Sequence, residues 1–300
     1  MRHTRAVIMA PAKLNLSLDI TGEDGAGYHL LDGVMISVGL SDILLLSLRE
    51  DTQISVSCSG GSVCRNIPVG EENLAAAMAR SFFAFTGLPF RGMDIHIHKR
   101  IPAQAGLAGG SADAAAVLAG LDHIFNPGLT SGQKTELALS VGSDVPFCLH
   151  GGCTRAKGRG ELLSPLPMPP DCCFAVAAPE QGMSTRLAFQ MYDNRNSEPP
   201  RPDTGALISA LEKGDLAAIG RAMGNVFECV CAASEAGKLK NIMLAQGALG
   251  AAMSGTGTAV AGLFREEDAA RRCLLDLREY APHTFFTHPV SNGAHVIFSD

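Results

Sequence analysis

The chain has 300 residues, of which 46% are hydrophobic and 18% are charged, a balance typical of a folded protein rather than a disordered one. Its formal net charge of −6 argues against a broad nucleic-acid-binding surface but leaves room for a local basic pocket. No apolar run approaches the roughly 18 residues of a membrane span, and the first residues do not resemble a secretory signal. We therefore expect a cytoplasmic protein with neither nucleic-acid nor membrane partners.

The nine cysteines are odd in number and scattered along the chain. None forms a C-x-x-C pair, and the nearest arrangement is Cys229-Val-Cys231. A zinc site or a disulfide framework is therefore the less favoured interpretation, and buried free thiols are the better one.

The first half of the sequence alternates predicted strands with predicted helices. A helix is predicted over Glu71–Phe85, with Asn73 near its start and Gly87 after its end, and another over Ser131–Val141. Apolar or alternating runs predict strands over Ala6–Ala10, Leu14–Thr21, Val34–Val38, Ile43–Leu48 and Met93–His98.

A glycine-rich turn begins the stretch IPAQAGLAGGSADAAAVLAG at residues 101–120. The helix predicted to leave this turn is Ser111–Phe125, with Ser111 as its N-cap and Asp113 adding negative charge to its first turn. The pattern is neither G-x-x-x-x-G-K-[ST] nor G-x-G-x-x-G, because the glycines fall at positions 106, 109 and 110 and no lysine follows them.

The second half begins after a proline-rich stretch, Ser164–Asp171, which is the predicted domain boundary. Strands and helices are mixed on both sides of it, so the fold class is α+β. The elements expected beyond it are a strand over Cys172–Ala178, a polar loop over Asp193–Thr204, helices between Gly205 and Gln246, a strand–turn–strand unit over Ala251–Phe264, a helix over Glu266–Tyr280 and a strand over Ala294–Phe298.

A glycine turn that opens a helix exposes backbone amides at the positive end of the helix dipole, which favours an anion. The dipole contributes only about 0.3–1 kcal/mol at an exposed site, so nucleotide phosphates would need cations as well. The alternative is a turn whose small residues only let the helix pack closely. The cations that could assist are Lys13, Lys99, Arg100, Arg155, Lys157 and Arg159.

Two charged residues stand at unusual places in the sequence. Lys13 lies with Asn15 inside an apolar strand, where a lysine reduces stability unless it has a partner or a task; a lysine at the edge of a strand is the alternative. Asp144 precedes Val-Pro at the start of a helix, where an N-cap is the alternative to a functional carboxylate.

Five blocks, in order, resemble the GHMP small-molecule kinases: PAKLNLSLDITG, GYHLLDGVM, IPAQAGLAGGSADAA, VGSDVPF and MSGTGTAVAGLF. The resemblance extends from about residue 8 to residue 265. It implies a two-domain α+β fold, with an ATP-binding N-terminal domain similar to domain 2 of ribosomal protein S5 over residues 1–168. A ferredoxin-like C-terminal domain would cover residues 169–300.

Members of this superfamily transfer the γ-phosphoryl group of ATP to a substrate hydroxyl, so ATP and Mg²⁺ are the implied cofactors. The P-A-K-L-N, G-Y-H and G-x-D-V-P blocks are most similar to the kinases that act on a cytidine diphosphate-linked methylerythritol, which is the implied small-molecule partner. A monomer or a homodimer is expected. The alternatives are another GHMP kinase, acting on mevalonate, homoserine or a sugar, and a nucleotide-binding relative without catalysis.

The resemblance implies two catalytic residues. Asp144 would be the general base that takes the hydroxyl proton. Lys13 would hold Asp144 ionised and stabilise the developing alkoxide.

The resemblance also implies a nucleotide site. Asn73 and Lys99 match positions near the adenine pocket, with a helix cap and a solvated charge as the respective alternatives. Two positions depart from the family's G-L-G-G-G-S-S-D-A-A pattern: Ala108 replaces a glycine, and Ala112 replaces the second serine. The residues expected to cradle the phosphates are Gly106, Ala108, Gly109, Gly110 and Ser111.

At the substrate end, Tyr28 and His29 would grip the cytosine ring and Phe189 would stack on it. A satisfied surface pair and a core phenylalanine are the alternatives. Asn15 would bind the methylerythritol end or the network around the base. The second glycine turn, with Ser254, Gly255 and Thr256, would face the substrate cleft, and a tight hairpin turn is the alternative.

Overall fold

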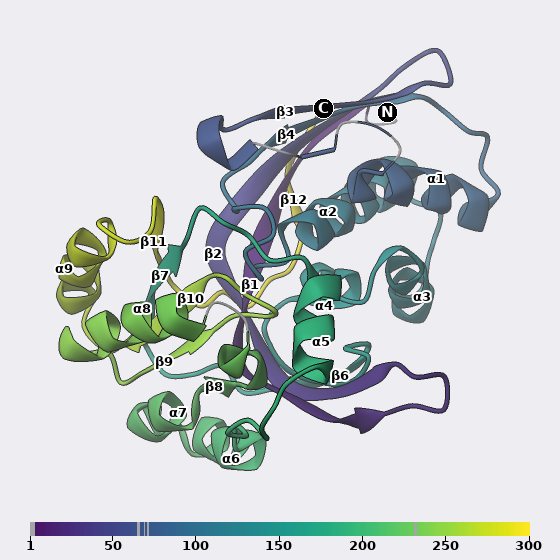
Figure 1. The fold of residues 1–300 in the computed structure, drawn as a ribbon. Helices are drawn as coiled ribbons and strands as arrows, with labels where there is room; N and C mark the ends of the chain where they lie inside the picture. The colour runs from purple at the N-terminus through teal and green to yellow at the C-terminus, as the bar shows by residue number, and fades with distance from the viewer. Residues whose placement is uncertain (1–3, 65–66, 69, 71, 231–232) are drawn as a thin grey trace.

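Two β-sheets organise the chain in the computed structural model, which describes residues 4–300 except 65–66, 69, 71 and 231–232. In the N-terminal half, helices pack against a long ribbon of two strands, and the C-terminal half forms a smaller sheet with its own helices (Figure 1). Among the described residues, no helix is long and apolar enough to cross a membrane.

The larger sheet is built on β1 (Arg5–Glu23) and β2 (His29–Leu48), which pair antiparallel along almost their whole length. Each of these strands joins two segments that the sequence predicted separately. Pro11 does not divide β1, because the register shifts between Pro11 and Ala12, and a bulge is where a strand accepts a proline. The other strands of this sheet are β3 (Ile54–Ser59), β4 (Met93–His98), β5 (Cys153–Gly158), β6 (Leu162–Leu166), β8 (Gly224–Asn225) and β12 (His295–Ser299).

Helices cover one face of the β1–β2 ribbon (Figure 1). The predicted Ser131–Val141 helix is confirmed with the same bounds, and the predicted Glu71 helix is confirmed from Leu74 onward, with Asn73 as its N-cap. Its first predicted residue, Glu71, lies outside the described residues. The helices of this layer are α1 (Leu74–Thr86), α2 (Gly109–Phe125), α3 (Ser131–Val141) and α4 (Val145–His150).

The predicted start of α2 is wrong by two residues. The helix begins at Gly109 and its N-cap position is Ala108, so Ser111 lies within the first turn and does not cap it. Asp113 does not add the predicted negative charge to the first turn either, because it lies after that turn and its side chain is buried. The cause is the left-handed backbone at Ala108, which lets the loop turn into the helix earlier than the serine suggests.

The C-terminal half contains a second, antiparallel sheet in the order β11-β7-β10-β9. This is the strand order of a ferredoxin-like domain, so the predicted two-domain α+β class is confirmed. Two helices pack on this sheet (Figure 1). The elements are β7 (Cys173–Ala178), α8 (Ala233–Ala245), β9 (Gly250–Met253), β10 (Val260–Phe264), α9 (Glu267–Leu277) and β11 (His283–Thr287).

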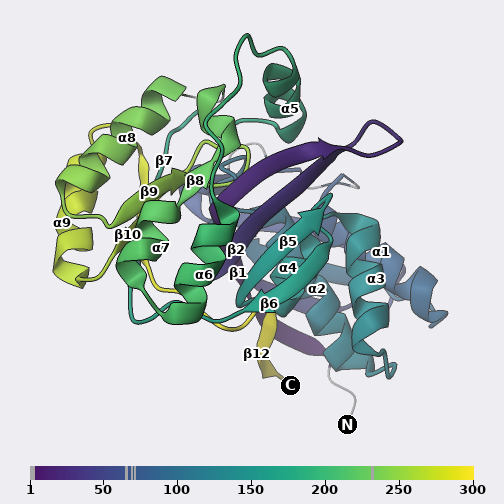
Figure 2. The same cartoon turned by 90° about the horizontal axis from the view of Figure 1, so that it is seen from below.

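The helical region predicted between Gly205 and Gln246 is interrupted. After α6 (Thr204–Lys213) and α7 (Leu216–Ala222), the chain forms the short strand β8 and a 3₁₀ turn, Val226–Cys229, before α8. A second 3₁₀ turn covers Gly61–Cys64. The helix α5 (Thr185–Asp193), which the sequence did not predict, lies beside the hairpin end of β1 and β2 (Figure 2).

The proline-rich stretch begins within β6 and leads to β7, and the domain boundary near residue 168 stays a prediction. The last strand, β12, returns to the first sheet, where it pairs antiparallel with β1. The eight described cysteines are free thiols, five of them buried, and Cys231 lies outside the described residues.

Candidate active site

A cavity of about 1060 Å³ lies where β1, β2, the loop before α2, α5 and the turn between β9 and β10 meet. Almost all of the predicted site residues line it, although they come from both halves of the chain. Ser254 is the exception, because it is fully buried behind the lining. The predicted residues in the lining are Lys13, Asn15, Tyr28, His29, Asn73, Lys99, Gly106, Ala108, Gly109, Gly110, Ser111, Asp144, Phe189, Gly255 and Thr256.

The loop before α2 presents backbone amides to the cavity. The hydrogen bond from the Ala112 amide to the Ala108 carbonyl is the first of the helix, so the amides of Gly109, Gly110 and Ser111 come before the helical pattern. All three residues line the cavity, at the start of a helix of 17 residues. This arrangement suits an anion with several oxygens.

The two departures from the family pattern in this loop have different consequences. Ala108 has φ 57° and ψ 31°, a left-handed conformation that is unfavourable for any residue with a Cβ. Ala112 is fully buried in the core and is absent from the cavity lining. The methyl group of Ala112 therefore replaces a serine hydroxyl at a position that points away from the site.

Lys13 is held by an amide oxygen rather than by a carboxylate. Its side chain is only 4% exposed, and its Nζ donates to Oδ1 of Asn15 at 2.5 Å. The same Oδ1 accepts the Gly255 amide at 2.9 Å. A neutral partner leaves the positive charge of Lys13 uncompensated, so it is available to a negatively charged group in the cavity.

Asp144 occupies the N-cap position of α4, but its side chain makes no capping hydrogen bond. Within the described part of the chain, its carboxylate makes no hydrogen bond or ion pair. Burial raises the pKa of the nearby Cys148 thiol; Asp144 raises this pKa further, and Lys13 lowers it. Both charges therefore act on one buried thiol, and both face the cavity.

Lys99 is not a solvated charge, which was one of the two interpretations of this residue from the sequence. It is 3% exposed, and its Nζ lies 2.5 Å from Oδ2 of Asp42 and 2.8 Å from Oδ2 of Asp113. A Cβ on Gly109 would lie 3.3 Å from this Nζ. The two-carboxylate cluster therefore sits directly beneath the start of α2, and a role of Lys99 in binding adenine stays a prediction.

The proton in this cluster belongs on Asp113. Asp42 also accepts the amides of Arg100 and Ile101, whereas Oδ1 of Asp113 is buried and has no hydrogen-bond partner among the residues that the structure describes. Burial raises the pKa of Asp113 to about 8; Lys99 opposes this shift and Asp42 adds to it. Burial alone would lower the pKa of Lys99, but the two carboxylates raise it, so the ammonium stays charged.

The far end of the cavity is aromatic. The ring of His29 stacks on Phe189 with centroids 4.8 Å apart, and its Nε2 lies 2.8 Å from Oδ1 of Asp193. Tyr28 is 56% exposed, and the Arg159 guanidinium lies 3.8 Å from its ring centroid. Phe189 also contacts the core through Phe227, so it faces both the cavity and the interior.

Asn73 uses both ends of its amide locally. Its Oδ1 accepts the Ala75 amide and its Nδ2 donates to the Pro68 carbonyl. The helix-cap interpretation is therefore confirmed, while a contact with adenine stays a prediction. The turn with Ser254, Gly255 and Thr256 is likewise a hairpin, since β9 and β10 pair antiparallel, and two of these residues also face the cavity.

Sequence reasoning missed several residues of the site. Asp42 had a detectable signal, because it lies directly between two apolar runs, Val34–Val38 and Ile43–Leu48, that form one strand. Arg159 was considered only as a cation. It pairs with Asp24 at 2.6 Å, and Arg155, from the same group, pairs with Asp32 at 2.6 Å. Asn225 carried no sequence signal at all.

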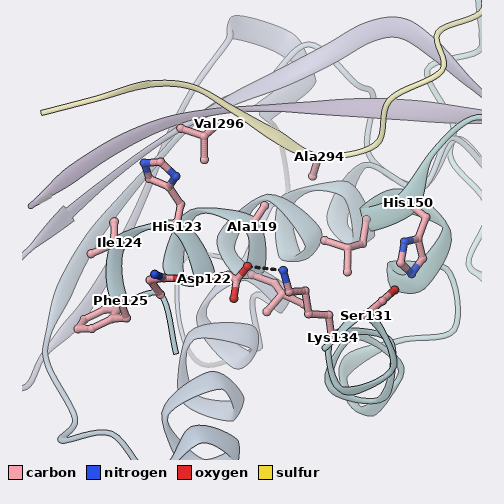
Figure 3. A pocket seen from close by; sticks show the side chains of 13 residues that line it. Ala119, Asp122, His123, Ile124, Phe125, Ser131, Lys134, His150, Ala294 and Val296 are labelled. Carbon is pink, nitrogen blue, oxygen red and sulfur yellow. Dashed lines mark hydrogen bonds and ion pairs between the residues drawn. The ribbon is translucent and has the colours of Figure 1, made fainter. Parts of the chain in front are cut away.

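A second cavity of about 1010 Å³ lies at the other end of α2, beside α3, α4 and β12 (Figure 3). Its charged residues Asp122 and Lys134 pair with each other, as the dashed line in Figure 3 shows. None of the predicted site residues lines it. Asp122 therefore serves as a control position outside the first cavity.

Comparison with known proteins places these features in a family. The model of the GHMP kinases N terminal domain matches residues 73–152, and that of the GHMP kinases C terminal matches residues 207–283. The 4-diphosphocytidyl-2-C-methyl-D-erythritol kinase of Symbiobacterium thermophilum is 42% identical over 269 residues, covering 89% of this chain and 93% of that protein. The protein of the same name from Brevibacillus brevis is 36% identical over 288 residues, covering 94% and 95%.

Solved structures agree with this assignment. A crystal structure of 4-(cytidine 5'-diphospho)-2C-methyl-D-erythritol kinase superposes with a TM-score of 0.77 at 32% identity, covering 96% of this chain and all of that one. Homoserine kinase from Cytophaga hutchinsonii superposes with a TM-score of 0.79 at 20% identity, covering 99% and 98%. The second likeness is one of fold alone.

The left-handed alanine generates a stability prediction. Ala108→Gly should raise the free energy of unfolding by up to about 1 kcal/mol, because glycine adopts this conformation without a Cβ clash. Ala112→Gly, inside the same helix, should lower it by at least about 1 kcal/mol. Urea unfolding of both variants checks this, and equal losses in the two would contradict the strain at Ala108.

The buried carboxyl of Asp113 generates a pH prediction. Since its pKa rises from 3.8 to about 8 on folding, the folded protein keeps a proton that the unfolded chain releases between these values. The unfolding free energy should therefore fall across this range as the pH rises. Asp113→Asn should remove this contribution, so the variant gains stability relative to wild type toward pH 8.

Chemical denaturation at a series of pH values measures this difference. Asp122→Asn, at the C-terminal end of α2, where the side chain is half-buried and paired with Lys134, is the control and should follow the wild-type slope. Parallel curves for wild type and Asp113→Asn would show that Asp113 is ionised in the folded protein.

Proposed function

The chain belongs to the GHMP kinase family, and from this premise we propose that it is a 4-diphosphocytidyl-2-C-methyl-D-erythritol kinase. The proposed reaction transfers the γ-phosphoryl group of ATP to the 2-hydroxyl of its cytidine diphosphate-linked substrate, a step of isoprenoid biosynthesis. The observation that carries the proposal is 36–42% identity, over nearly the full length, to several proteins of that name. A cytoplasmic location, as a monomer or homodimer, belongs to the same proposal.

Asp144 is the proposed general base. Its carboxylate faces the cavity without a capping bond, so an approaching hydroxyl meets an acceptor that is not already engaged. A positioned base contributes typically about 10²–10⁴ in rate. Proton transfer from the hydroxyl to Asp144 makes the substrate oxygen a better nucleophile toward the γ-phosphorus.

Lys13 is the proposed electrostatic partner. Its ammonium is buried, fixed by Asn15 and without a carboxylate partner within hydrogen-bond distance in the described chain. A fixed charge in such an environment stabilises negative charge on the attacking oxygen or the transferring phosphoryl group.

The amides of Gly109, Gly110 and Ser111 are the proposed cradle for the ATP phosphates. Phosphoryl transfer needs positioning and charge neutralisation more than covalent chemistry from the protein. Mg²⁺ fits here, because it prefers phosphate and water oxygens with few protein ligands, and the Ser111 hydroxyl is an oxygen donor at this place in the lining. When bound, the ion neutralises phosphate charge.

The aromatic end of the cavity is the proposed cytosine site. Tyr28, His29 and Phe189 offer flat surfaces there, and aromatic faces bind a planar base through stacking. In this proposal Asn15 and Thr256 contact the alcohol end of the substrate, because Asn15 bonds Lys13 and Thr256 lines the same cavity.

An acceptor panel tests the proposed function. With ATP and Mg²⁺, the purified protein should phosphorylate the cytidine diphosphate-linked methylerythritol and leave mevalonate, homoserine and galactose unchanged, as followed by ADP release and product mass. Turnover of only another alcohol would move the protein to a different GHMP activity. Nucleotide binding without any turnover would identify a non-catalytic relative.

Substitution of the proposed base gives a sharper test. Asp144→Asn should reduce kcat at least about a hundredfold while the circular dichroism spectrum and melting temperature stay near those of wild type. Lys13→Met should also lower kcat strongly, with the Kd for ATP little changed. Asp122→Asn is the control and should keep wild-type turnover, and a fully active Asp144→Asn variant would remove Asp144 from the mechanism.

A further inference from the structure

Asn225 is a buried polar residue outside the cavity lining. It lies in β8, where its backbone pairs with Leu18 of β1, three positions after Asn15. Its side chain is fully engaged: Nδ2 donates to the carbonyls of Met253 and Gly255, each at 2.7 Å, and Oδ1 accepts the Phe227 amide at 2.9 Å.

The two carbonyls bound by Asn225 flank Ser254, so the amide holds the turn between β9 and β10 from both sides. The turn in turn holds β1. The Gly255 amide donates to Oδ1 of Asn15 at 2.9 Å, and Oγ of Ser254 accepts the Asn15 amide at 3.1 Å.

Asn15 connects this turn to Lys13. Its Oδ1 is the acceptor for the Lys13 ammonium, and the Gly255 amide fixes the direction in which that oxygen points. A Cβ on Gly255 would lie 3.1 Å from the Lys13 Nζ, so the turn also limits the space that the ammonium occupies.

We infer that Asn225 is a positioning residue for Lys13, acting through the Gly255 turn and Asn15. The inference rests on the proposed role of Lys13 in phosphoryl transfer. In this arrangement, a residue of the C-terminal half of the chain fixes the position of a cation that the N-terminal half carries.

The chemistry of the side chain explains why an asparagine stands here. Two carbonyl oxygens and one amide hydrogen surround it, so the position requires two donors and one acceptor on a short side chain. An aspartate would place a carboxylate against two carbonyls, and an alanine would leave all three backbone groups without this partner.

Kinetics of three variants test the inference. Asn225→Ala and Asn15→Ala should each lower kcat about 10- to 100-fold, because a small displacement of a catalytic charge has effects of this size, while the KM for ATP changes little. If Asn225 acts through Asn15, the double variant should be no slower than the slower single variant.

The matched control is Thr204→Val. Thr204 is as buried as Asn225, and its hydroxyl also bonds β1 from the C-terminal half, through Oγ of Ser17 at 3.1 Å. Its bond does not lead to Lys13. This variant should lose stability comparably but keep the wild-type kcat. Asn225→Ser, which retains one donor, serves if Asn225→Ala melts below the assay temperature.

A second readout does not depend on activity. Limited acetylation with an N-hydroxysuccinimide ester, followed by peptide mass spectrometry, measures how tightly the Lys13 amine is held. The Lys13 acetylation rate should rise several-fold in Asn225→Ala and in Asn15→Ala, with no further rise in the double variant, and it should stay at the wild-type value in Thr204→Val.

The outcomes separate the inference from the proposed function. An Asn225→Ala variant that behaves like Thr204→Val in both readouts, or that adds its full effect to that of Asn15→Ala, overturns the inference while the function stands. Absence of wild-type turnover overturns the proposed function, and the acetylation rates still decide whether Asn225 holds Lys13.

Discussion

The site depends on close contacts among three backbone segments: β1, the loop before α2, and the turn between β9 and β10. A Cβ on Gly106 would lie 2.0 Å from the Ser254 carbonyl oxygen, and the Ser254 hydroxyl donates to the Gly106 carbonyl at 2.9 Å. The Lys13 amide donates to the Leu107 carbonyl at 3.2 Å. The anion-binding loop, the strand that carries the lysine and the C-terminal turn are thus bonded into one block, which is the preorganisation that charge stabilisation requires.

Two buried lysines in this block illustrate how partners determine what a charge can do. Lys99 lies between Asp42 and Asp113, so the carboxylates of the cluster compensate its positive charge. The cluster as a whole is neutral when Asp113 carries a proton. Among the described residues, the hydrogen-bond partner of the Lys13 ammonium is the amide oxygen of Asn15 alone, so its field extends into the cavity. The same residue type at similar burial therefore supports structure at one position and favours a chemical role at the other.

The sequence predicted which segments form helices and strands better than it predicted where each one begins and which residues it contacts. The Met93–His98 strand has the predicted bounds because buried residues alternate along it. The Ser131–Val141 helix has the predicted bounds because Thr130 and Gln133 form a capping box at its start and Gly142 follows its end. Ser111 was misplaced because the left-handed conformation of Ala108 depends on the packed loop and leaves no mark on residue type. Asn225 was missed because its partners are backbone carbonyls, which no side-chain motif encodes, and the continuous β1 was divided because a bulge at Pro11 is a tertiary feature.

The pairing of β12 with β1 has a consequence for how the protein is made. The outer edge of β1 at Ala6–Met9 is covered by His295–Ser299. These two segments are the first and the last of the described elements to be synthesised. Until β12 emerges, the nascent N-terminal sheet exposes an unpaired apolar edge, which is the kind of surface that invites intermolecular strand addition. Final closure of the first sheet therefore has to await synthesis of β12, which follows every other element of the two sheets, and the edge of β1 is open to strand addition between chains during that interval.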